Sequence, residues 1–303
     1  MNDQGDPADI LDGALDETQT DAESSGKLSG FPLTFSGVAS FASTGWSRLF
    51  LWHTVVITAI TGSCMLLLGQ HWAPVLDTAI SRLPEQGGLN EGRLQWPATH
   101  QSGSLAGNQF LQIIVDPNGE QQHGQLADCQ IELRSESWVV ASILGYMEFP
   151  YARQTFQINR AKQIPWWGSR RPFLLIGISL SCGLAYGFAS LLLGFVGIWP
   201  SKTVAFFSDR QGSFWSLLRL STAAWLPPGA LMAAACLCYA LNLLPLLGLL
   251  IMIPLYCVAG WIYLFFSPFF LPSVACSEGN PFDREEETPA EELEQSDSKN
   301  PFA

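Results

Sequence analysis

The strongest constraint on the fold is a long stretch near the C-terminal end without a single charged side chain. From Leu220 to Cys276 the chain contains no Asp, Glu, Lys or Arg. A helix needs about 20 apolar residues to cross the hydrocarbon core of a bilayer. The stretch is therefore long enough for two membrane-spanning helices, and Asn-Leu-Leu-Pro at 242–245 predicts the turn between them.

Two further apolar stretches, at residues 49–68 and 172–199, lie nearer the N-terminus. Together these stretches predict a membrane α-helical bundle of four spans rather than a soluble protein with an apolar core. The predicted order begins with an acidic tail (1–47), span one (48–70), a water-exposed domain (71–171) and span two (172–199). A polar loop with an interfacial helix (200–219), span three (220–243), span four (244–270) and a second acidic tail (271–303) follow.

The formal net charge of −12 comes from the two ends of the chain. Residues 1–47 carry eight acidic side chains against one lysine, and residues 277–303 carry nine against two basic ones. Residues 48–276 are close to neutral, with twelve basic and ten acidic side chains. Acidic ends poor in aromatic residues cannot bury enough apolar surface to fold, so we expect disordered tails. The sequence has no basic patch for binding nucleic acid.

Residues 71–171 predict a small α+β domain that is mainly antiparallel β. Apolar side chains between Trp72 and Leu83 recur every three or four residues, as on a helix that packs its apolar face on the domain. The alternative is a helix lying flat on the lipid. Farther on, short runs of β-branched and aromatic residues alternate with turn-forming residues. Residues 113–115 and 129–133 are predicted to pair as a hairpin.

The reactive side chains show no pattern typical of an active site or a metal site. His100 and His123 lie in polar loops without a second metal ligand at helical or hairpin distance. Six of the seven cysteines fall within or at the end of the apolar spans, and Cys129 stands alone in the domain. The acids of the domain have no spacing that would bring two carboxylates together: Asp116, Asp128, Glu132, Glu136 and Glu148. We therefore expect no enzyme activity, no metal and no cofactor.

Six small residues in the second span recur every three or four positions and predict a helix-packing face. They are Ser179, Gly183, Gly187, Ser190, Gly194 and Gly197. Because these residues lack bulk, another helix backbone can approach closely. The approaching helix belongs either to the same bundle or to a partner, which would be a second copy of the chain or another membrane protein.

Residues just before the second span predict contact with lipid headgroups. Trp166, Trp167, Arg170 and Arg171 combine amphipathic indoles with guanidinium groups that pair with phosphate. The lipid bilayer is therefore the first predicted partner. His53, one turn into span one, is predicted to be an interfacial anchor, with a proton-relay group as the alternative.

Prolines predict breaks in the last two spans. Pro228 suits the first turn of a helix, so residues 213–226 are predicted to form a separate interfacial helix. Pro254 removes one backbone hydrogen bond and is expected to kink the fourth span. In a transporter, such breaks serve as mobile elements.

The C-terminal tail contains the same tripeptide twice. Asn280-Pro281-Phe282 and Asn300-Pro301-Phe302 flank an acidic run. One interpretation is a pair of docking ligands, held away from an anionic bilayer by the acids. The alternative is a pair of Asn-Pro turns in a flexible tail.

Four spans place both termini on one side of the membrane, and basic residues suggest which side. The short loops on the side of the termini contain or adjoin four basic residues, Arg48, Lys202, Arg210 and Arg219. This bias predicts that the termini are cytoplasmic. A second basic cluster around span two, at residues 160–171, would then lie outside. A domain of about 100 residues translocates largely regardless of its charge, so the short loops carry more weight.

Several short sequence segments resemble an uncharacterised family of bacterial multi-pass membrane proteins. The matching segments are Leu83-Pro84, Gly92-Arg93-Leu94, Ile113-Ile114-Val115-Asp116 with Gly119, and Leu217-Leu218-Arg219-Leu220 leading to Pro227-Pro228. The last of these also resembles the third-span region of the Yip-type membrane proteins. The resemblance covers roughly residues 35–268, and the acidic tails with their repeated Asn-Pro-Phe depart from it. It implies a bacterial inner-membrane location and an outward-facing β-rich domain between spans one and two, and it implies no activity.

The sequence therefore favours a non-catalytic membrane protein whose extracytoplasmic domain binds or senses a component of the cell envelope. The alternative is a transporter or channel component, which would need polar side chains at mid-membrane depth. Only Ser179, Ser221, Thr222 and Asn242 are candidates for that role. An intramembrane enzyme is a third alternative, but His53 has no ionisable partner in the spans.

Overall fold

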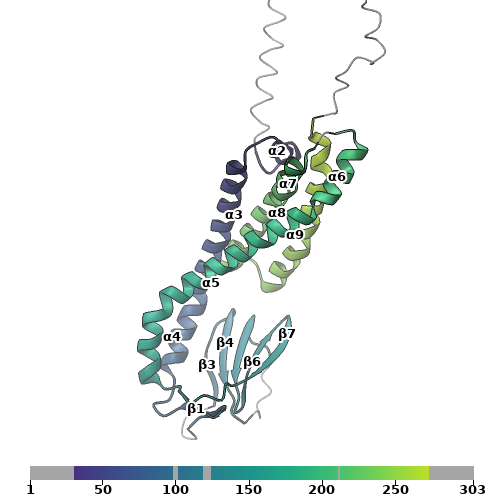
Figure 1. Ribbon diagram of the computed structural model, residues 1–303. Helices are drawn as coiled ribbons and strands as arrows, with labels where there is room; N and C mark the ends of the chain where they lie inside the picture. Colours follow the sequence, from purple (N-terminus) through teal and green to yellow (C-terminus); the bar gives the residue numbers. More distant parts are fainter. Residues whose placement is uncertain (1–30, 98–101, 119–123, 211, 273–303) are drawn as a thin grey trace, which may run out of the picture.

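The computed structural model describes residues 31–97, 102–118, 124–210 and 212–272. Within them it has four helical segments that are long and apolar enough to cross a membrane, and a separate β-rich domain attached at one end (Figure 1). The predicted disordered tails lie outside the described residues, apart from the segments next to the helices. The two Asn-Pro-Phe tripeptides, His100 and His123 also lie outside them.

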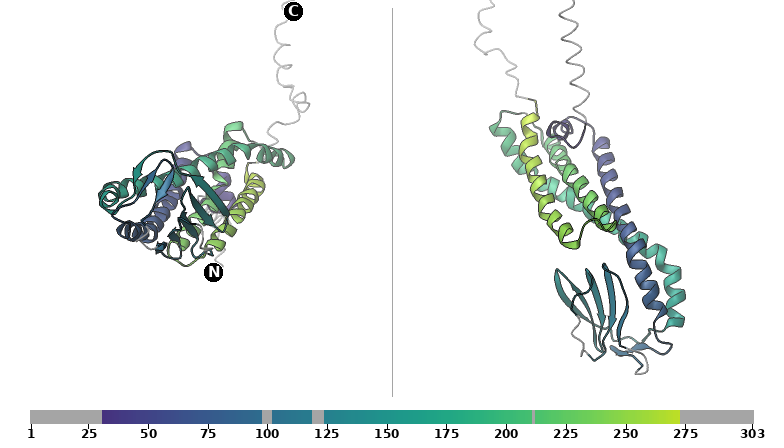
Figure 2. Two further views of the ribbon diagram at one scale, coloured as in Figure 1. Left: turned by 90° about the horizontal axis from the view of Figure 1, so that it is seen from below. Right: turned by 180° about the vertical axis from the view of Figure 1, so that it is seen from behind.

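Two long antiparallel helical rods connect the bundle to the β domain. The first consists of α3 (Trp46–Leu67), a π-helical turn η1 (Leu68–Trp72) and α4 (Ala73–Ser81). The second is α5 (Arg160–Val196), with 37 residues. At 1.5 Å per residue each rod is about 55 Å long, well beyond the roughly 30 Å of a bilayer core. Both rods therefore extend past the bundle as a stalk beside the β domain (Figures 1 and 2).

The second rod begins earlier than the sequence suggests. The predicted span boundary at residue 172 is no helix boundary, because α5 begins at Arg160, twelve residues before Pro172. Asn159 caps this start by accepting a hydrogen bond from the backbone of Lys162 at 3.0 Å. Pro165 and Pro172 both lie inside the helix. The predicted boundary at 172 marks the start of the apolar stretch, and the helix itself extends farther toward the N-terminus.

The remaining helices complete the bundle. They are α2 (Phe35–Ser40), α6 (Ile198–Phe207), α7 (Phe214–Ala223), α8 (Leu226–Ala240), α9 (Leu246–Phe266) and the 3₁₀ helix η2 (Ser267–Phe270). Helix α3 packs between α5 and α8, and α9 packs on α8. Residues 200–207, predicted as part of a polar loop, belong to α6. This helix continues from α5 after Gly197, and its apolar residues Ile198 and Ala205 are buried against α7 and α2.

The end of the bundle away from the β domain includes residues predicted to be a tail. Val38 and Phe41 are buried, and the Arg48 guanidinium lies 5.0 Å from the centre of the Phe41 ring. Arg219 donates hydrogen bonds of 2.7 Å to the carbonyl oxygens of Thr44 and Ala42. The predicted tail boundary at residue 47 thus differs from the structure, in which residues 35–47 fold onto the helices.

The third span is interrupted, as the prolines predict. Helix α7 ends at Ala223, and α8 begins at Leu226 with prolines in its first turn. Helix α7 is, however, not a surface helix: Leu217 and Leu220 are buried, because α5, α6 and α2 pack around it. The predicted turn between spans three and four is present, with Asn242 in the left-handed region at φ 62°.

The β domain contains two sheets. The larger has the strand order β3 (Gly103–Gly107), β4 (Leu111–Val115), β5 (Cys129–Leu133), β6 (Ser137–Ser142) and β7 (Gly145–Pro150). The smaller has the order β2 (Arg93–Gln95), β1 (Gly88–Asn90) and β8 (Phe156–Gln157). All neighbouring strands are antiparallel except β4 and β5. The domain is thus mainly antiparallel, as predicted.

The predicted hairpin of residues 113–115 and 129–133 is wrong. Strand β4 pairs with β5 in parallel, with Ile113 opposite Ile131. Parallel neighbours need a crossover of about a dozen residues. The long connection from Asp116 to Asp128 meets this requirement, and its length was the available signal.

One face of the larger sheet packs on α4. Val75, Ala79 and Leu83 of the stalk form a core with Leu111 and Val115 of β4. The predicted packing of this apolar helix face on the domain is thus confirmed. Each fully buried side chain of this kind contributes roughly 1.5–3 kcal/mol to stability. This core fixes the orientation of the domain relative to the stalk.

Candidate functional site

The small residues of α5 face other helices of the same chain. All six predicted packing residues, Ser179 to Gly197, are buried. A Cβ atom added at Gly183 would lie 3.1 Å from the carbonyl oxygen of Ile57 in α3, and one at Gly194 would lie 2.8 Å from Cα of Thr222 in α7. One at Gly197 would lie 2.8 Å from Cδ2 of Leu264 in α9. On this face α5 therefore packs on α3, α7 and α9 of the same chain, and contact with a partner stays a prediction.

The four residues predicted to contact headgroups divide into two pairs. Trp167 is buried, and its indole N–H donates to Oδ1 of Asp77 on α4 at 2.6 Å. Arg171 donates to Oδ2 of the same carboxylate at 2.8 Å. Trp166 and Arg170 instead point outward, with the guanidinium 5.1 Å from the ring centre. The first pair fastens α5 to α4 in the stalk, and headgroup contact of the second pair stays a prediction.

His53 is buried inside the bundle rather than exposed as an anchor. Its Nδ1 lies 3.1 Å from the carbonyl oxygen of Leu49, and its ring borders an apolar cavity of about 290 Å³ between α3 and α5. The described residues contain no group of three or more His, Cys, Asp or Glu side chains close enough to hold a metal ion. His53 therefore has no metal-binding neighbours there.

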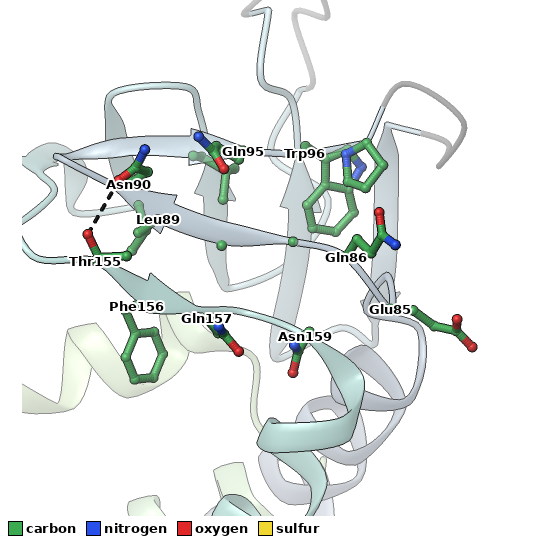
Figure 3. A pocket seen from close by; sticks show the side chains of 14 residues that line it. Glu85, Gln86, Leu89, Asn90, Gln95, Trp96, Thr155, Phe156, Gln157 and Asn159 are labelled. Atoms are coloured by element: carbon green, nitrogen blue, oxygen red, sulfur yellow. Dashed lines mark hydrogen bonds between the residues drawn. The ribbon is translucent and has the colours of Figure 1, made fainter.

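A groove in the domain is formed by the smaller sheet and the residues beside it (Figure 3). Its volume is about 920 Å³, within the range of ligand sites. The groove lies at the end of the domain farthest from the helix bundle (Figure 1). Five carboxamide side chains share in its lining: Gln86, Asn90, Gln95, Gln157 and Asn159.

Glycines keep the floor of the groove flat. A Cβ atom at Gly87 would lie 2.9 Å from the carbonyl oxygen of Ile158, and one at Gly88 would lie 3.0 Å from that of Phe156. Strands β1 and β8 can therefore lie this close only because the two side chains are absent. Thr155 closes one end of the groove by donating to Oδ1 of Asn90 at 3.3 Å (Figure 3).

The groove offers neutral hydrogen-bonding groups together with aromatic surface. The side chains of Gln86, Gln95 and Gln157 make no hydrogen bond to any described residue, and each carboxamide can both donate and accept. Trp96 and Phe156 add aromatic surface, and Glu85 is the charged residue of the lining. This composition suits a neutral ligand rich in hydroxyl groups and disfavours an anion.

Sequence reasoning missed this groove because its residues come from two separated segments. Residues 85–97 supply β1 and β2, and residues 155–159 return after the whole five-stranded sheet to supply β8. Neither segment contains a recognisable motif. The available signal was that each segment contains several carboxamide side chains. These side chains form one groove only after β1 and β8 have paired, so the signal alone does not predict a site.

A second polar cluster lies on the larger sheet. The strand register places Glu132 opposite Val139 and Val139 opposite Glu148, so two acids of the domain share one row despite their uninformative spacing. Arg134 donates to Glu132 at 2.8 Å and to the Tyr146 hydroxyl at 3.0 Å, and Tyr146 donates to Glu148 at 3.1 Å.

Hydrogen bonds set the ionisation of this cluster. The Ser137 hydroxyl donates to Glu148 at 2.5 Å and is the main cause that lowers the pKa of Glu148, with Tyr146 and Arg134 adding to it. The hydrogen bond to Glu132 raises the pKa of Arg134 further. A carboxylate with a lowered pKa is a poor proton acceptor. The cluster therefore fits the fastening of β5, β6 and β7 better than acid–base chemistry.

The β domain also touches the helix bundle directly. The Tyr239 hydroxyl of α8 donates to Asp128 before β5 at 2.8 Å. His71, in the π-helical turn, has Nε2 2.8 Å from the carbonyl oxygen of Ala240, and its ring lies 4.2 Å from that of Phe110 before β4. The bundle-facing ends of β4 and β5 are thus joined to the end of α8.

No protein-family model, no curated protein and no solved structure matches this chain. The resemblance to a family of bacterial membrane proteins therefore stays an expectation from the sequence.

Proposed function

We propose that the chain is a non-catalytic multi-pass membrane protein whose β domain binds a neutral saccharide in the cell envelope. The observation that carries this proposal is the open groove with five carboxamides and two aromatic side chains. Sugars present hydroxyl groups that donate and accept, as carboxamides do, and an apolar ring face that packs on aromatic side chains. The four apolar helices would anchor this domain.

The proposed orientation places the domain outside the cytoplasm and both termini inside. Arg48, Lys202, Arg210 and Arg219 belong to the end of the bundle opposite the β domain (Figure 1). Positive residues in short connections favour the cytoplasmic side. The groove, at the far end of the domain, would then face the space beyond the membrane. In a bacterium this membrane would be the inner one, as the resemblance implies.

Binding of neutral oligosaccharides to the full chain in detergent micelles tests the proposal. We expect oligomers of N-acetylglucosamine to bind and to change the tryptophan fluorescence, because Trp96 lines the groove. The double variant Gln95→Ala with Gln157→Ala removes two unpaired carboxamides and should weaken binding at least tenfold. At about 1 kcal/mol for each neutral hydrogen bond, such a loss is of the right order.

Gln125→Ala provides the matched control, since this exposed glutamine lies outside the groove. It should leave the affinity unchanged. Absence of binding to a panel of neutral oligosaccharides, or equal loss in the control, would contradict the proposal.

The alternative, a transporter or channel component, is supported by one observation. The third span is discontinuous between α7 and α8, and Trp225 at this break has a buried indole N–H without a hydrogen-bond partner in the described residues. Against it, Ser221 donates to the carbonyl oxygen of Gly194 at 2.6 Å and Ser190 to that of Gly187 at 2.8 Å, so these buried hydroxyls serve helix packing. Ion or solute flux into proteoliposomes would favour the alternative.

A further inference from the structure

We infer that the bundle-facing rim of the larger sheet is a lipid-contacting surface that rests in the headgroup region of the membrane. The rim consists of Leu126, Ile143, Leu144 and Met147. This inference depends on the proposal that α7 with α8, and α9, span a bilayer, and it is independent of what the groove binds.

The strand register places the rim at the bundle side of the domain. Strand β4 begins next to Phe110, whose ring lies 5.2 Å from that of Tyr239 in α8. Strand β5 runs parallel to β4, and β6 runs back, so Ser142 at the end of β6 is opposite Cys129 at the start of β5. The turn that follows Ser142 therefore lies at the edge of the sheet that faces the helices (Figures 1 and 2).

The α8–α9 turn marks where the outer surface of the bilayer would lie. Helix α9 has 21 residues, which at 1.5 Å each give about 32 Å, close to the thickness of the hydrocarbon core. Its first residue, Leu246, then lies near one boundary of this core. The rim is held near this boundary because Asp128 binds Tyr239, and Gln109 donates a hydrogen bond to Asn242 in the turn.

The rim carries large apolar side chains that nothing in the described chain covers. Leu144 is 79% exposed, Leu126 63% and Met147 59%. In the adjoining α8–α9 turn, Leu243 is 72% exposed. Exposed apolar side chains that gather in one place mark an interaction surface. The apolar surface of the spans thus continues onto the edge of the β domain.

The charges of the sheet are distributed as a lipid contact requires. Residues 137–147, which contain β6 and the turn, include no Asp, Glu, Lys or Arg. The charged side chains Arg134 and Glu136 belong to the connection at the opposite end of β5 and β6. The two nearer carboxylates are hydrogen-bonded, Glu148 by Ser137 and Asp128 by Tyr239. A rim without charges can enter the boundary between headgroups and acyl chains, where a buried charge would be costly.

A second copy of the chain is the competing occupant. Strand β7 is an edge strand, and exposed edges can pair with another chain. Lipid fits better because the rim is continuous with the spans and because its exposed leucines stand at the strand ends, where strand pairing would not cover them. Pairing of two β7 strands is therefore an outcome that the experiment must be able to detect.

Photo-crosslinking of the full chain in vesicles of phosphatidylethanolamine and phosphatidylglycerol distinguishes these occupants. The photoreactive residue benzoylphenylalanine is placed at Leu144, and the products are identified by mass spectrometry. We expect lipid adducts at least tenfold above those formed from the same residue at Phe156, which is 50% exposed beside the groove. Phe188, an exposed residue of α5, serves as the reference for lipid contact.

The reference position separates the two proposals. Lipid adducts at Phe188 but only background adducts at Leu144 would overturn the rim contact and leave the membrane spans intact. Crosslinks from Leu144 to a second copy would also overturn it. Absence of lipid adducts at Phe188 would contradict the membrane spans themselves, and the rim contact with them.

Discussion

The two halves of α5 pack against the first rod by different means. In the half within the bundle, Gly183 and Ser179 are small enough for α3 to pack directly on them, with Ile57 against Gly183 and Met65 against Ser179. In the stalk half, Trp167 and Arg171 reach across to Asp77 with hydrogen bonds. One continuous helix thus packs through small residues at one end, and adds a carboxylate contact to an apolar cluster at the other.

The difference follows from the proposed surroundings. Between helices in lipid there is no hydrophobic driving force, so close van der Waals contact has to hold them together. In water, apolar side chains and polar pairs both contribute, although partly exposed ion pairs contribute only about 0–1 kcal/mol. Contacts in the bundle should therefore resist salt and pH, whereas contacts of the stalk and domain should respond to them.

The largest effect is expected from filling the small-residue face. Gly183→Leu puts a branched side chain where even a Cβ atom would lie 3.1 Å from the Ile57 carbonyl oxygen, so α3 and α5 have to separate. Overpacking of this kind costs typically about 1–3 kcal/mol. The midpoint of thermal unfolding in detergent, followed by size-exclusion chromatography, should fall by several degrees at any salt concentration.

Gly177→Leu is the matched control on the same helix. A Cβ atom there would meet nothing within 4 Å, because Gly177 faces outward. This variant should leave the midpoint nearly unchanged. Because leucine has the higher helix propensity at both positions, equal losses in both variants would mean that the effect does not come from close packing at Gly183, and would remove one side of the comparison.

The small-residue face was predictable from the sequence because its signal is local. Residues three and four apart on a helix share a face whatever the rest of the chain does. The identity of the helix packed there was not predictable, since Thr222 and Leu264 meet Gly194 and Gly197 only after the chain has folded.

A smaller effect is expected from removing the stalk carboxylate. Asp77→Ala leaves the buried indole N–H of Trp167 without its acceptor and Arg171 without its ion pair. An unpaired buried donor costs about 1–3 kcal/mol, and the half-exposed ion pair adds less than 1. Thermal unfolding at low and high salt should show that only the smaller, ionic part is screened.

Asp77→Asn isolates the ionic part, because the amide oxygen can still accept from Trp167. It should destabilise less than Asp77→Ala and lose its effect at high salt. An Asp77→Asn variant as unstable as Asp77→Ala would show that charge alone fastens the stalk.

The stalk contact could not be found from the sequence. Asp77 falls off the apolar stripe of its helix, and Trp167 lies 90 positions away, beside an arginine pair that resembles a headgroup anchor. The groove of the β domain and the parallel pairing of β4 and β5 were not predicted for the same reason, because their residues are far apart in the sequence. Four apolar helices, a mainly antiparallel domain and the turn at Asn242 depend on local pattern, and these predictions hold.

A still smaller effect is expected where bundle and domain meet. Tyr239→Phe removes the hydrogen bond to Asp128 and keeps the ring against Phe110. Losing one such bond costs about 1 kcal/mol, and water replaces part of it at the half-buried carboxylate. Hydrogen exchange should quicken around the starts of β4 and β5 and stay unchanged in α7. Unchanged exchange in both would show that the domain is held by the stalk alone.

The smallest effect is expected from replacing Glu148 at the exposed end of the sheet. Its dependence on pH would distinguish it from an effect of packing. The pKa of Glu148 is lowered in the folded protein, chiefly by the Ser137 hydroxyl. The folded state therefore releases this proton at a lower pH than the unfolded state does. The resulting stabilisation is fully present above the unfolded pKa and disappears as the pH falls through the folded one.

Glu148→Gln lacks this titration, so the difference in unfolding midpoint between wild type and variant should be largest near neutral pH and vanish in acid. Gly183→Leu, in contrast, should lower the midpoint by the same amount at every pH, because no titrating group lies in its contact. A pH-dependent effect of Gly183→Leu would show that shape and charge are not divided between the two regions.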